Sequence, residues 1–213
     1  KFGTVAAHHS LLPEYRGFAP VQWAIINGEK ETGATLFKIN KGEIDSGEII
    51  SQKKITILPD DTGYSLDQRI VSNVINLFLK FFEDYKKNNI VLKVQDESKA
   101  TYTCKRIPED GKINWDQTSG QIINFIRAIS YPYPGAYCNF KNVIYQIIKA
   151  ELGENDKKKF SGTIPGRVFR INNKGIEVLC KEGTVFISEW KNMVSGEVIC
   201  TAESVKSLGN TIK

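Results

Sequence analysis

Two adjacent histidines, His8 and His9, are the residues near the start of the chain best suited to proton transfer. An apolar run over residues 4–7 precedes them, and Pro13 and Gly17 mark turns soon after. An apolar run that stops at polar residues, proline and glycine predicts a buried strand ending in a loop. In open α/β sheets such strand ends carry ligands, and an imidazole there exchanges protons near neutral pH. The alternatives are an ordinary loop histidine or, for two in a row, the remnant of a tag.

A set of ordered motifs resembles the folate-dependent formyltransferases. The motifs are His8-His9-Ser10-Leu11-Leu12-Pro13, Tyr15-Arg16-Gly17, Ala19-Pro20, Trp23-Ala24-Ile25-Ile26-Asn27-Gly28-Glu29, Glu31-Thr32-Gly33, Thr35-Leu36 and Asp45-Ser46-Gly47. The resemblance covers nearly the whole chain. It implies transfer of a formyl group from 10-formyltetrahydrofolate, the donor cosubstrate, to an amine. The family includes methionyl-tRNA formyltransferase and the N-formyltransferases of nucleotide-linked amino sugars.

The resemblance also implies roles for individual residues. His8 and Asp45 are the expected catalytic residues, and no metal is expected. The expected folate-binding residues are Ser10, Leu11, Leu12, Pro13 and, again, Asp45. His9 should point away from His8 in an extended chain, so we expect it to be structural or to face the substrate. Arg16 is a candidate for binding a substrate phosphate or for pairing with the loop around Asp45.

The family's Asn-x-His pattern is incomplete here, because Ala6 stands at the asparagine position if His8 is the histidine. Formyl transfer needs a proton removed from the amine, a stabilised tetrahedral oxygen and a proton for the leaving folate nitrogen. A histidine held by a carboxylate can act as acid and base and can donate to the oxyanion. The separation of 37 residues from His8 to Asp45 allows a strand–helix–strand crossover, which would bring the two side chains close together.

Composition is typical of a soluble globular chain, with 41% hydrophobic and 25% charged residues among 213. No apolar run approaches the roughly 20 residues of a membrane-spanning helix. The four cysteines are far apart, which argues against a zinc site or a redox pair and suits a reducing cytoplasm. The net charge of +5 lies mainly in residues 96–213, where 17 basic residues stand against 13 acidic ones. This mild bias could assist binding of tRNA or a nucleotide diphosphate, but it is far from a nucleic-acid signature, and solvated lysines are the favoured explanation.

The pattern of apolar residues predicts two domains. Residues 1–135 should form an α/β domain, the C-terminal part of a Rossmann-like formyltransferase sheet, so the chain reads as lacking the family's N-terminal segment. Expected elements are a helix over 20–27, strands over 34–39 and 48–58, and a long amphipathic helix after Pro59. The apolar residues of this helix form a stripe at helical spacing that we expect to be core: Leu66, Ile70, Val74, Leu77, Phe78 and Phe81. Thr118 and Gln121 form a capping-box pattern before another helix. Residues 136–213 show short β-rich runs, which favour a small barrel or sandwich and match the OB-like barrel that the resemblance implies.

Three functions agree with these features. The first is a formyltransferase whose acceptor is an amino sugar on a nucleotide, favoured by residues 106–115 and 131–136, with Met-tRNA next. The second, motivated by Ala6, is a non-catalytic or truncated protein of the same fold. The third is an enzyme that hydrolyses formyltetrahydrofolate.

Overall fold

The computed structural model describes residues 3–213, which form two compact units. The first unit ends at Arg106 and the second is Ile107–Lys213. This division differs from the expected boundary at residue 135. The cause is helix α3 (Ser119–Ala128), which packs against strands β7 (Val143–Leu152) and β10 (Thr184–Asn192) of the second unit.

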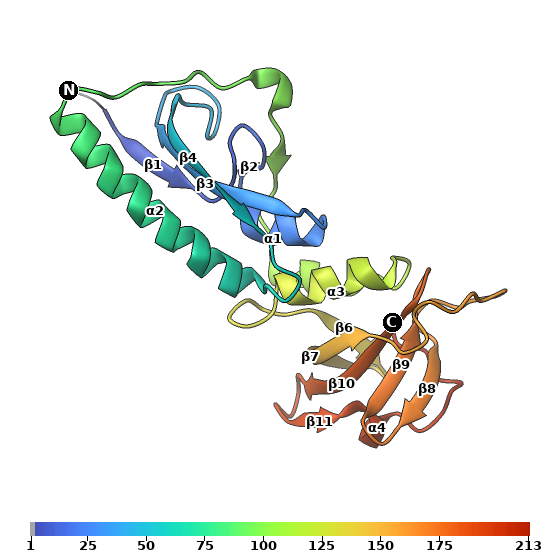
Figure 1. The fold of residues 1–213 in the computed structure, drawn as a ribbon. Coiled ribbons are helices and arrows are strands. Elements are labelled where there is room, and N and C mark those ends of the chain that lie inside the picture. The colour runs from blue at the N-terminus through green and yellow to red at the C-terminus, as the bar shows by residue number, and fades with distance from the viewer. Residues whose placement is uncertain (1–2) are drawn as a thin grey trace. The chain divides into compact units, whose positions relative to one another are not determined.

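The first unit is built around a three-stranded sheet (Figure 1). Its strands are β1 (Val5–His8), β3 (Glu31–Lys38) and β4 (Ile49–Thr56), with β3 in the centre. Six successive residues of β3, from position 32 to 37, are buried, as expected for the central strand of a covered sheet. The predicted mixed α/β character is therefore confirmed in this unit.

The predicted crossover between His8 and Asp45 is wrong. Strand β1 pairs with β3 in the antiparallel direction, with His8 opposite Thr35, and β3 pairs with β4 in the same way. Helix α1 (Pro20–Ile26) between β1 and β3 has only seven residues. After it the chain turns at Gly28, whose φ is 75°, and enters β3 against the direction of β1. A parallel crossover would need a longer connection that returns to the starting end of the sheet.

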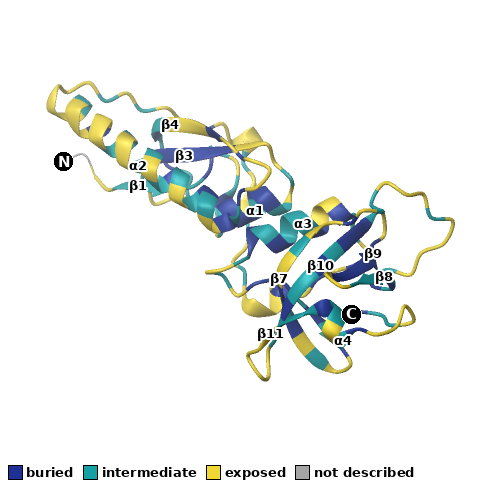
Figure 2. Cartoon of the chain, turned by 60° about the horizontal axis from the view of Figure 1, so that its bottom comes forward, coloured by how far each residue is buried: buried dark blue, intermediate teal, exposed yellow. Residues whose placement is uncertain are grey.

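Helix α2 (Gly63–Lys86) packs against β3, β4 and α1. It begins at the capping box of Thr62 and Ser65. Of the predicted apolar stripe, Leu66, Ile70 and Phe81 are buried, whereas Val74, Leu77 and Phe78 are only partly covered. Exposed residues become more frequent along the second half of this helix (Figure 2). The helical period was correctly predicted, but the depth of burial was overestimated.

Residues 87–106 form a connector at the end of the first unit and have little regular structure. The connector contains the short 3₁₀ helix η1 (Glu97–Lys99) and strand β5 (Tyr102–Thr103). Strand β5 pairs in parallel with β2 (Arg16–Gly17), so this late segment is attached beside the early histidine motif.

The second unit contains an antiparallel sheet with the strand order β6-β7-β10-β9-β8, and β11 pairs with β10. The remaining elements are η2 (Pro108–Gly111), β6 (Tyr137–Phe140), β8 (Val168–Asn172), β9 (Gly175–Leu179), β11 (Val198–Cys200) and α4 (Thr201–Ser204). The predicted capping box of Thr118 and Gln121 starts α3. Trp190 is fully buried, and its ring stacks on Tyr145 with a centroid separation of 4.2 Å.

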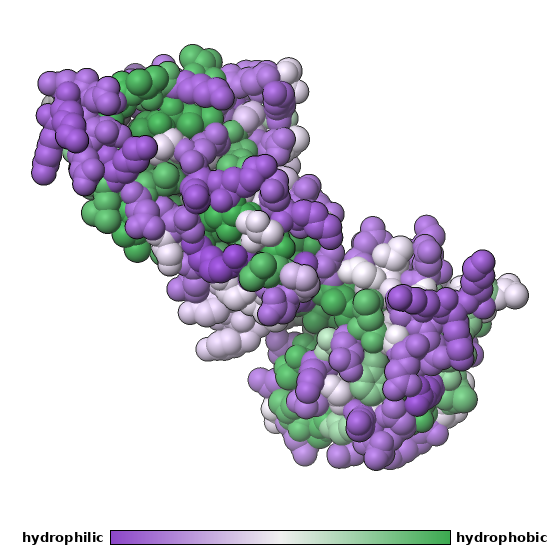
Figure 3. Space-filling view, viewed as in Figure 1, coloured by the Kyte–Doolittle hydropathy of each residue, from purple (hydrophilic) through white to green (hydrophobic). Residues whose placement is uncertain are grey.

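Across residues 3–213, we find no helix that combines the length and the apolar character needed to cross a bilayer. Hydrophilic side chains are interspersed with apolar ones over the face of the chain shown in Figure 3. Several large apolar side chains of α2 are exposed, among them Ile75, Leu79 and Phe82.

Candidate active site

His8 is the last residue of β1 and is 7% exposed. Its Nε2 lies 2.7 Å from the carbonyl oxygen of Tyr15. A carbonyl oxygen only accepts, so we assign the ring proton to Nε2. The other ring nitrogen, Nδ1, lies 3.5 Å from Oδ2 of Asp45. In the neutral ring, Nδ1 is therefore the nitrogen that can take up a proton, next to a carboxylate that would stabilise the resulting charge.

Asp45 is held in a loop between β3 and β4. Its carboxylate Oδ2 accepts a hydrogen bond of 2.8 Å from the backbone N–H of Gly17. Gly17 has a φ of 96°, and a Cβ at this position would lie 2.6 Å from the carbonyl oxygen of Thr103. Only glycine allows this close approach without strain, so Gly17 helps to place the donor for Asp45. This hydrogen bond joins the predicted motifs around Arg16-Gly17 and Asp45-Ser46-Gly47.

The electrostatic surroundings of His8 favour its neutral form. Burial lowers the pKa of His8 below its ordinary value of 6.5, while the hydrogen bond to Tyr15 and the charge of Asp45 act in the opposite direction and raise the pKa. The charge of His9 lowers the pKa further. A neutral imidazole at neutral pH is the form that a general base requires.

This lowered pKa predicts a pH dependence of stability. Between the pKa of folded His8 and about 6.5, the unfolded chain binds more protons than the folded chain. The contribution of His8 to the free energy of unfolding is therefore complete above about pH 6.5 and decreases as the pH falls through this window. We expect urea unfolding at pH 7.5 and 5.5 to show a smaller loss of stability in His8→Asn than in the unmodified protein. An equal loss in both proteins would contradict the lowered pKa.

Apart from Asp45, the expected folate-binding residues divide into two pairs. Ser10 and Leu12 are buried: the Ser10 hydroxyl donates to the carbonyl oxygen of Glu14, and Leu12 packs with Phe37 and Ile49. Leu11 and Pro13 instead line a cavity of about 360 Å³, whose lining also includes Leu12, Glu14, Glu29, Glu31 and Lys54. The side chains of Leu11 and Pro13 are thus the more accessible pair.

His9 faces helix α2. Its Nδ1 lies 2.8 Å from Oδ1 of Asp67, and both side chains are about three-tenths exposed. Its partner thus differs from those of His8, which are Tyr15 and Asp45. His9 retains the accessibility that a substrate contact would need.

Arg16 does not have the exposure that a substrate-binding residue requires. Its side chain is 0% exposed. The guanidinium donates to Gln95 Oε1 from Nε and Nη2, to Glu97 from Nη1 and Nη2, and to the Tyr102 hydroxyl from Nη1. These five bonds match the five N–H donors of arginine, and the contact with Glu97 is the main cause of the raised pKa of Arg16. The expected phosphate contact is therefore replaced by an internal one, whereas the expected link to the Asp45 loop is present through Gln95.

Ala6 lies opposite Phe37 and packs against the cluster of Leu12, Phe37 and Ile49. Because side chains alternate along a strand, Ala6 and His8 are on the same side of β1. The position that the family fills with asparagine is therefore beside the histidine. Within residues 3–213, no cluster of three or more histidine, cysteine or acidic side chains is arranged to hold a metal ion.

Comparison with known proteins agrees with this fold. Residues 1–80 match the family described as formyl transferase, and residues 105–203 match the formyl transferase C-terminal domain. The second match begins close to the boundary between the two compact units. The chain therefore belongs to the folate-dependent formyltransferase family, as the sequence motifs predicted.

Three relatives illustrate the similarity. The methionyl-tRNA formyltransferase of Fusobacterium nucleatum is 34% identical over 97% of this chain and 66% of its own length. An N-formyltransferase from Helicobacter canadensis, solved with folinic acid and dTDP-3-aminofucose, is 29% identical, covers 86% of this chain and 65% of its own, and has a TM-score of 0.68. The methionyl-tRNA formyltransferase of Clostridium thermocellum is 25% identical over 70% of this chain and 63% of its own, with a TM-score of 0.59. The chain spans about two thirds of the length of the curated relatives it matches.

Gln95 is the residue that sequence reasoning missed. It is 5% exposed and contacts both Arg16 and the loop of Asp45. The sequence offered no signal for it, because a glutamine within a polar connector has neither periodicity nor a motif.

Proposed function

We propose that this chain carries the catalytic pair of an enzyme that transfers the formyl group of 10-formyltetrahydrofolate to a primary amine. The observation that supports this proposal best is the separation of 3.5 Å between His8 Nδ1 and Asp45 Oδ2, within motifs that resemble those of the family. The amine nitrogen attacks the formyl carbon, the bond from that carbon to the folate nitrogen breaks, and the folate nitrogen gains a proton. His8 takes up the amine proton at Nδ1 and returns it to the folate nitrogen.

Each neighbour of His8 has a defined part in this proposal. Asp45 stabilises the imidazolium that forms when Nδ1 gains a proton, and the Tyr15 carbonyl fixes the ring by accepting from Nε2. Leu11 and Pro13 provide accessible surface for the folate, and His9 faces the acceptor. The sheet of β1, β3 and β4 is proposed as the C-terminal part of a Rossmann-like sheet, and the second unit as an OB-like barrel. The likeness to the Helicobacter canadensis enzyme supports this arrangement.

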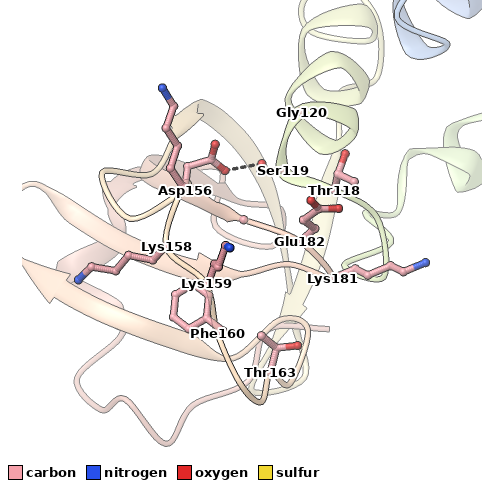
Figure 4. A pocket seen from close by; sticks show the side chains of 12 residues that line it. Thr118, Ser119, Gly120, Asp156, Lys158, Lys159, Phe160, Thr163, Lys181 and Glu182 are labelled. Carbon is pink, nitrogen blue, oxygen red and sulfur yellow. Dashed lines mark hydrogen bonds between the residues drawn. The ribbon is translucent and has the colours of Figure 1, made fainter.

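The second unit contains a feature that bears on the acceptor. A cavity of about 800 Å³ there is lined by four lysines, Lys157, Lys158, Lys159 and Lys181, together with Thr118, Ser119, Gly120, Asp156, Phe160, Thr163, Glu182 and Gly183. Figure 4 shows the side chains of Lys158 and Lys181 extending outward from their loops, while Asp156 is turned toward Ser119. The Asp156 carboxylate also accepts from the backbone N–H of Thr184, so it is engaged within the chain. The lysines are thus suited to attract a phosphate-bearing molecule.

We propose Met-tRNA as the first candidate acceptor. The lysine-lined cavity and the Met-tRNA formyltransferases among the relatives support it over the nucleotide amino sugar that the sequence favoured. The sugar nucleotide remains the second candidate, supported by the Helicobacter canadensis structure.

The test uses the full-length protein with 10-formyltetrahydrofolate and, separately, Met-tRNA and dTDP-linked amino sugars. Release of tetrahydrofolate only when an amine acceptor is present would support the proposed transfer. Release of formate without an acceptor would instead identify a hydrolase, and no reaction with any acceptor would indicate a non-catalytic protein.

A lysine variant tests whether the lysine-lined cavity binds Met-tRNA. Replacing Lys157, Lys158 and Lys159 together by glutamine should weaken Met-tRNA binding and reduce its dependence on salt, because each lost phosphate contact lowers the log–log salt slope by roughly 0.7–0.9. A binding titration at several salt concentrations measures this slope. Replacing the three exposed residues Lys53, Lys86 and Lys87 of the first unit, with the same change in charge, is the matched control. Equal effects of the two triple variants would show that only net charge matters.

A further inference from the structure

We propose that Gln95 is a positioning residue that holds Asp45 within reach of His8. Gln95 belongs to the connector after α2 and is almost fully buried, at 5% exposure. Its amide nitrogen Nε2 donates to the carbonyl oxygens of Asp45 and Gly47, both at 2.7 Å. Both N–H donors of this amide are therefore directed at the turn that carries the expected catalytic carboxylate.

The orientation of the Gln95 amide is fixed by Arg16. Gln95 Oε1 accepts from Arg16 Nε at 3.2 Å and from Nη2 at 2.8 Å. A guanidinium has only donors, so the oxygen of Gln95 must face Arg16 and the nitrogen must face the turn. A buried arginine thus sets the direction of the amide that holds the Asp45 turn.

The turn needs such support because of its backbone conformation. Asp45 has a φ of 54°, in the left-handed region that is unfavourable for residues other than glycine. In this conformation its side chain reaches both the N–H of Gly17, at 2.8 Å, and Nδ1 of His8, at 3.5 Å. Loss of the two bonds from Gln95 would leave two carbonyl oxygens without these donors and would free the turn to relax. The carboxylate would then move away from His8.

A second contact holds the same loop two residues before Asp45, at Glu43. The Tyr102 hydroxyl accepts from Arg16 Nη1 at 2.9 Å and donates to Glu43 Oε2 at 2.6 Å. Arg16 therefore connects to the loop at Glu43 through Tyr102 and at Asp45 and Gly47 through Gln95. The inference depends on the proposed function only for its catalytic meaning, because the geometry of Asp45 and His8 can be measured without any reaction.

The test is a double-mutant cycle read from the pKa of His8, measured by NMR titration of its imidazole in the full-length protein. The titratable groups that act on His8 are Asp45 and His9, and His9 is itself paired with Asp67. Asp45→Asn should lower the pKa of His8, because it removes the charge that raises it. Gln95→Met should lower the pKa in the same direction. Adding Gln95→Met to Asp45→Asn should cause no further fall.

Two results would overturn the inference. One is an unchanged His8 pKa in Gln95→Met. The other is a fall that adds fully to that of Asp45→Asn. If Gln95→Met does not fold, Gln95→Glu replaces it in the cycle, because the ionised glutamate keeps an acceptor for Arg16 and lacks the amide N–H donors to the turn. The direct effect of its added charge is present in both backgrounds and therefore cancels.

The matched control is Asp96→Ala, at the residue next to Gln95. This change removes the side-chain acceptor for the backbone N–H of Ser98, and Asp96 contacts neither Arg16 nor Asp45. We expect it to leave the His8 pKa unchanged, and a fall equal to that of Gln95→Met would contradict a specific role for Gln95. In an active enzyme, Gln95→Met should also move the acidic limb of the pH–rate profile to lower pH. Absence of formyl transfer in the unmodified protein would overturn the proposed function and leave the titration result standing.

Discussion

Replacing His8 by asparagine is expected to lower kcat for formyl transfer by about 10²–10⁴-fold, the usual contribution of a positioned acid–base group. The asparagine amide can keep a hydrogen bond to the Tyr15 carbonyl but cannot take up the amine proton that we assign to Nδ1. A steady-state assay of tetrahydrofolate release with the preferred acceptor measures the change. Thermal unfolding at pH 7.5 should confirm that the variant remains folded, so that the lower kcat is due to the lost acid–base group and not to unfolding.

His9→Asn is the matched control for this prediction. It changes the neighbouring histidine, whose partner is Asp67 on α2 and not Asp45. We expect its kcat to fall by less than about tenfold, because His9 is outside the proposed proton path. If His9→Asn lost as much activity as His8→Asn, or if His8→Asn lost little, the assignment of the catalytic base to His8 would be wrong.

Ala6→Asn is expected to raise kcat by about 10²–10³-fold, which is the usual contribution of one donor to an oxyanion. Asparagine at this position would lie on the same side of β1 as His8 and would restore the family's Asn-x-His pattern. The affinity for folate should be nearly unchanged, because this interaction forms mainly in the transition state. Measuring kcat together with the dissociation constant for folate separates the two effects.

The new amide also has a structural cost. Ala6 packs against Leu12, Phe37 and Ile49, so a carboxamide here is partly desolvated and should lower the free energy of unfolding by about 1–3 kcal/mol. Ala6→Val adds apolar volume without a donor and should give no gain in kcat. An unchanged kcat in Ala6→Asn would mean that another donor already stabilises the oxyanion. Tighter folate binding without a faster reaction would assign this position a ground-state role.

Local sequence patterns predicted the elements of this chain better than their connections. The capping box of Thr118 and Gln121, the helix beginning at Pro20 and the apolar period of α2 all depend on neighbouring residues, and each is present. The antiparallel pairing of β1 with β3 depends on how the chain turns after Gly28, and no local pattern distinguishes this from a parallel crossover. The approach of His8 to Asp45 was anticipated from the motifs, although the predicted path between them was wrong.

The role of Arg16 and the existence of the Gln95 contact could not be read from the sequence. An arginine in a segment marked by proline and glycine is usually exposed, and only the tertiary contacts with Gln95, Glu97 and Tyr102 show that this one is buried. These three partners lie about 80 residues later in the chain, where nothing marks them as belonging to the site. The compact units divide at residue 106 and not at the expected boundary of residue 135 for a similar reason, because α3 looks like any amphipathic helix until its packing partners are known.

The contacts of Gln95, in the connector after α2, with Arg16 and Asp45 have a consequence for protein synthesis. His8 and Asp45 leave the ribosome well before Gln95, which follows Asp45 by 50 residues. At translation rates of about 5–20 residues per second, roughly 3–10 s pass before Gln95 is added. During that interval the nascent chain contains both members of the proposed catalytic pair without the amide that holds their geometry. The geometry of the site is therefore completed only after a further 50 residues have followed Asp45 in the chain.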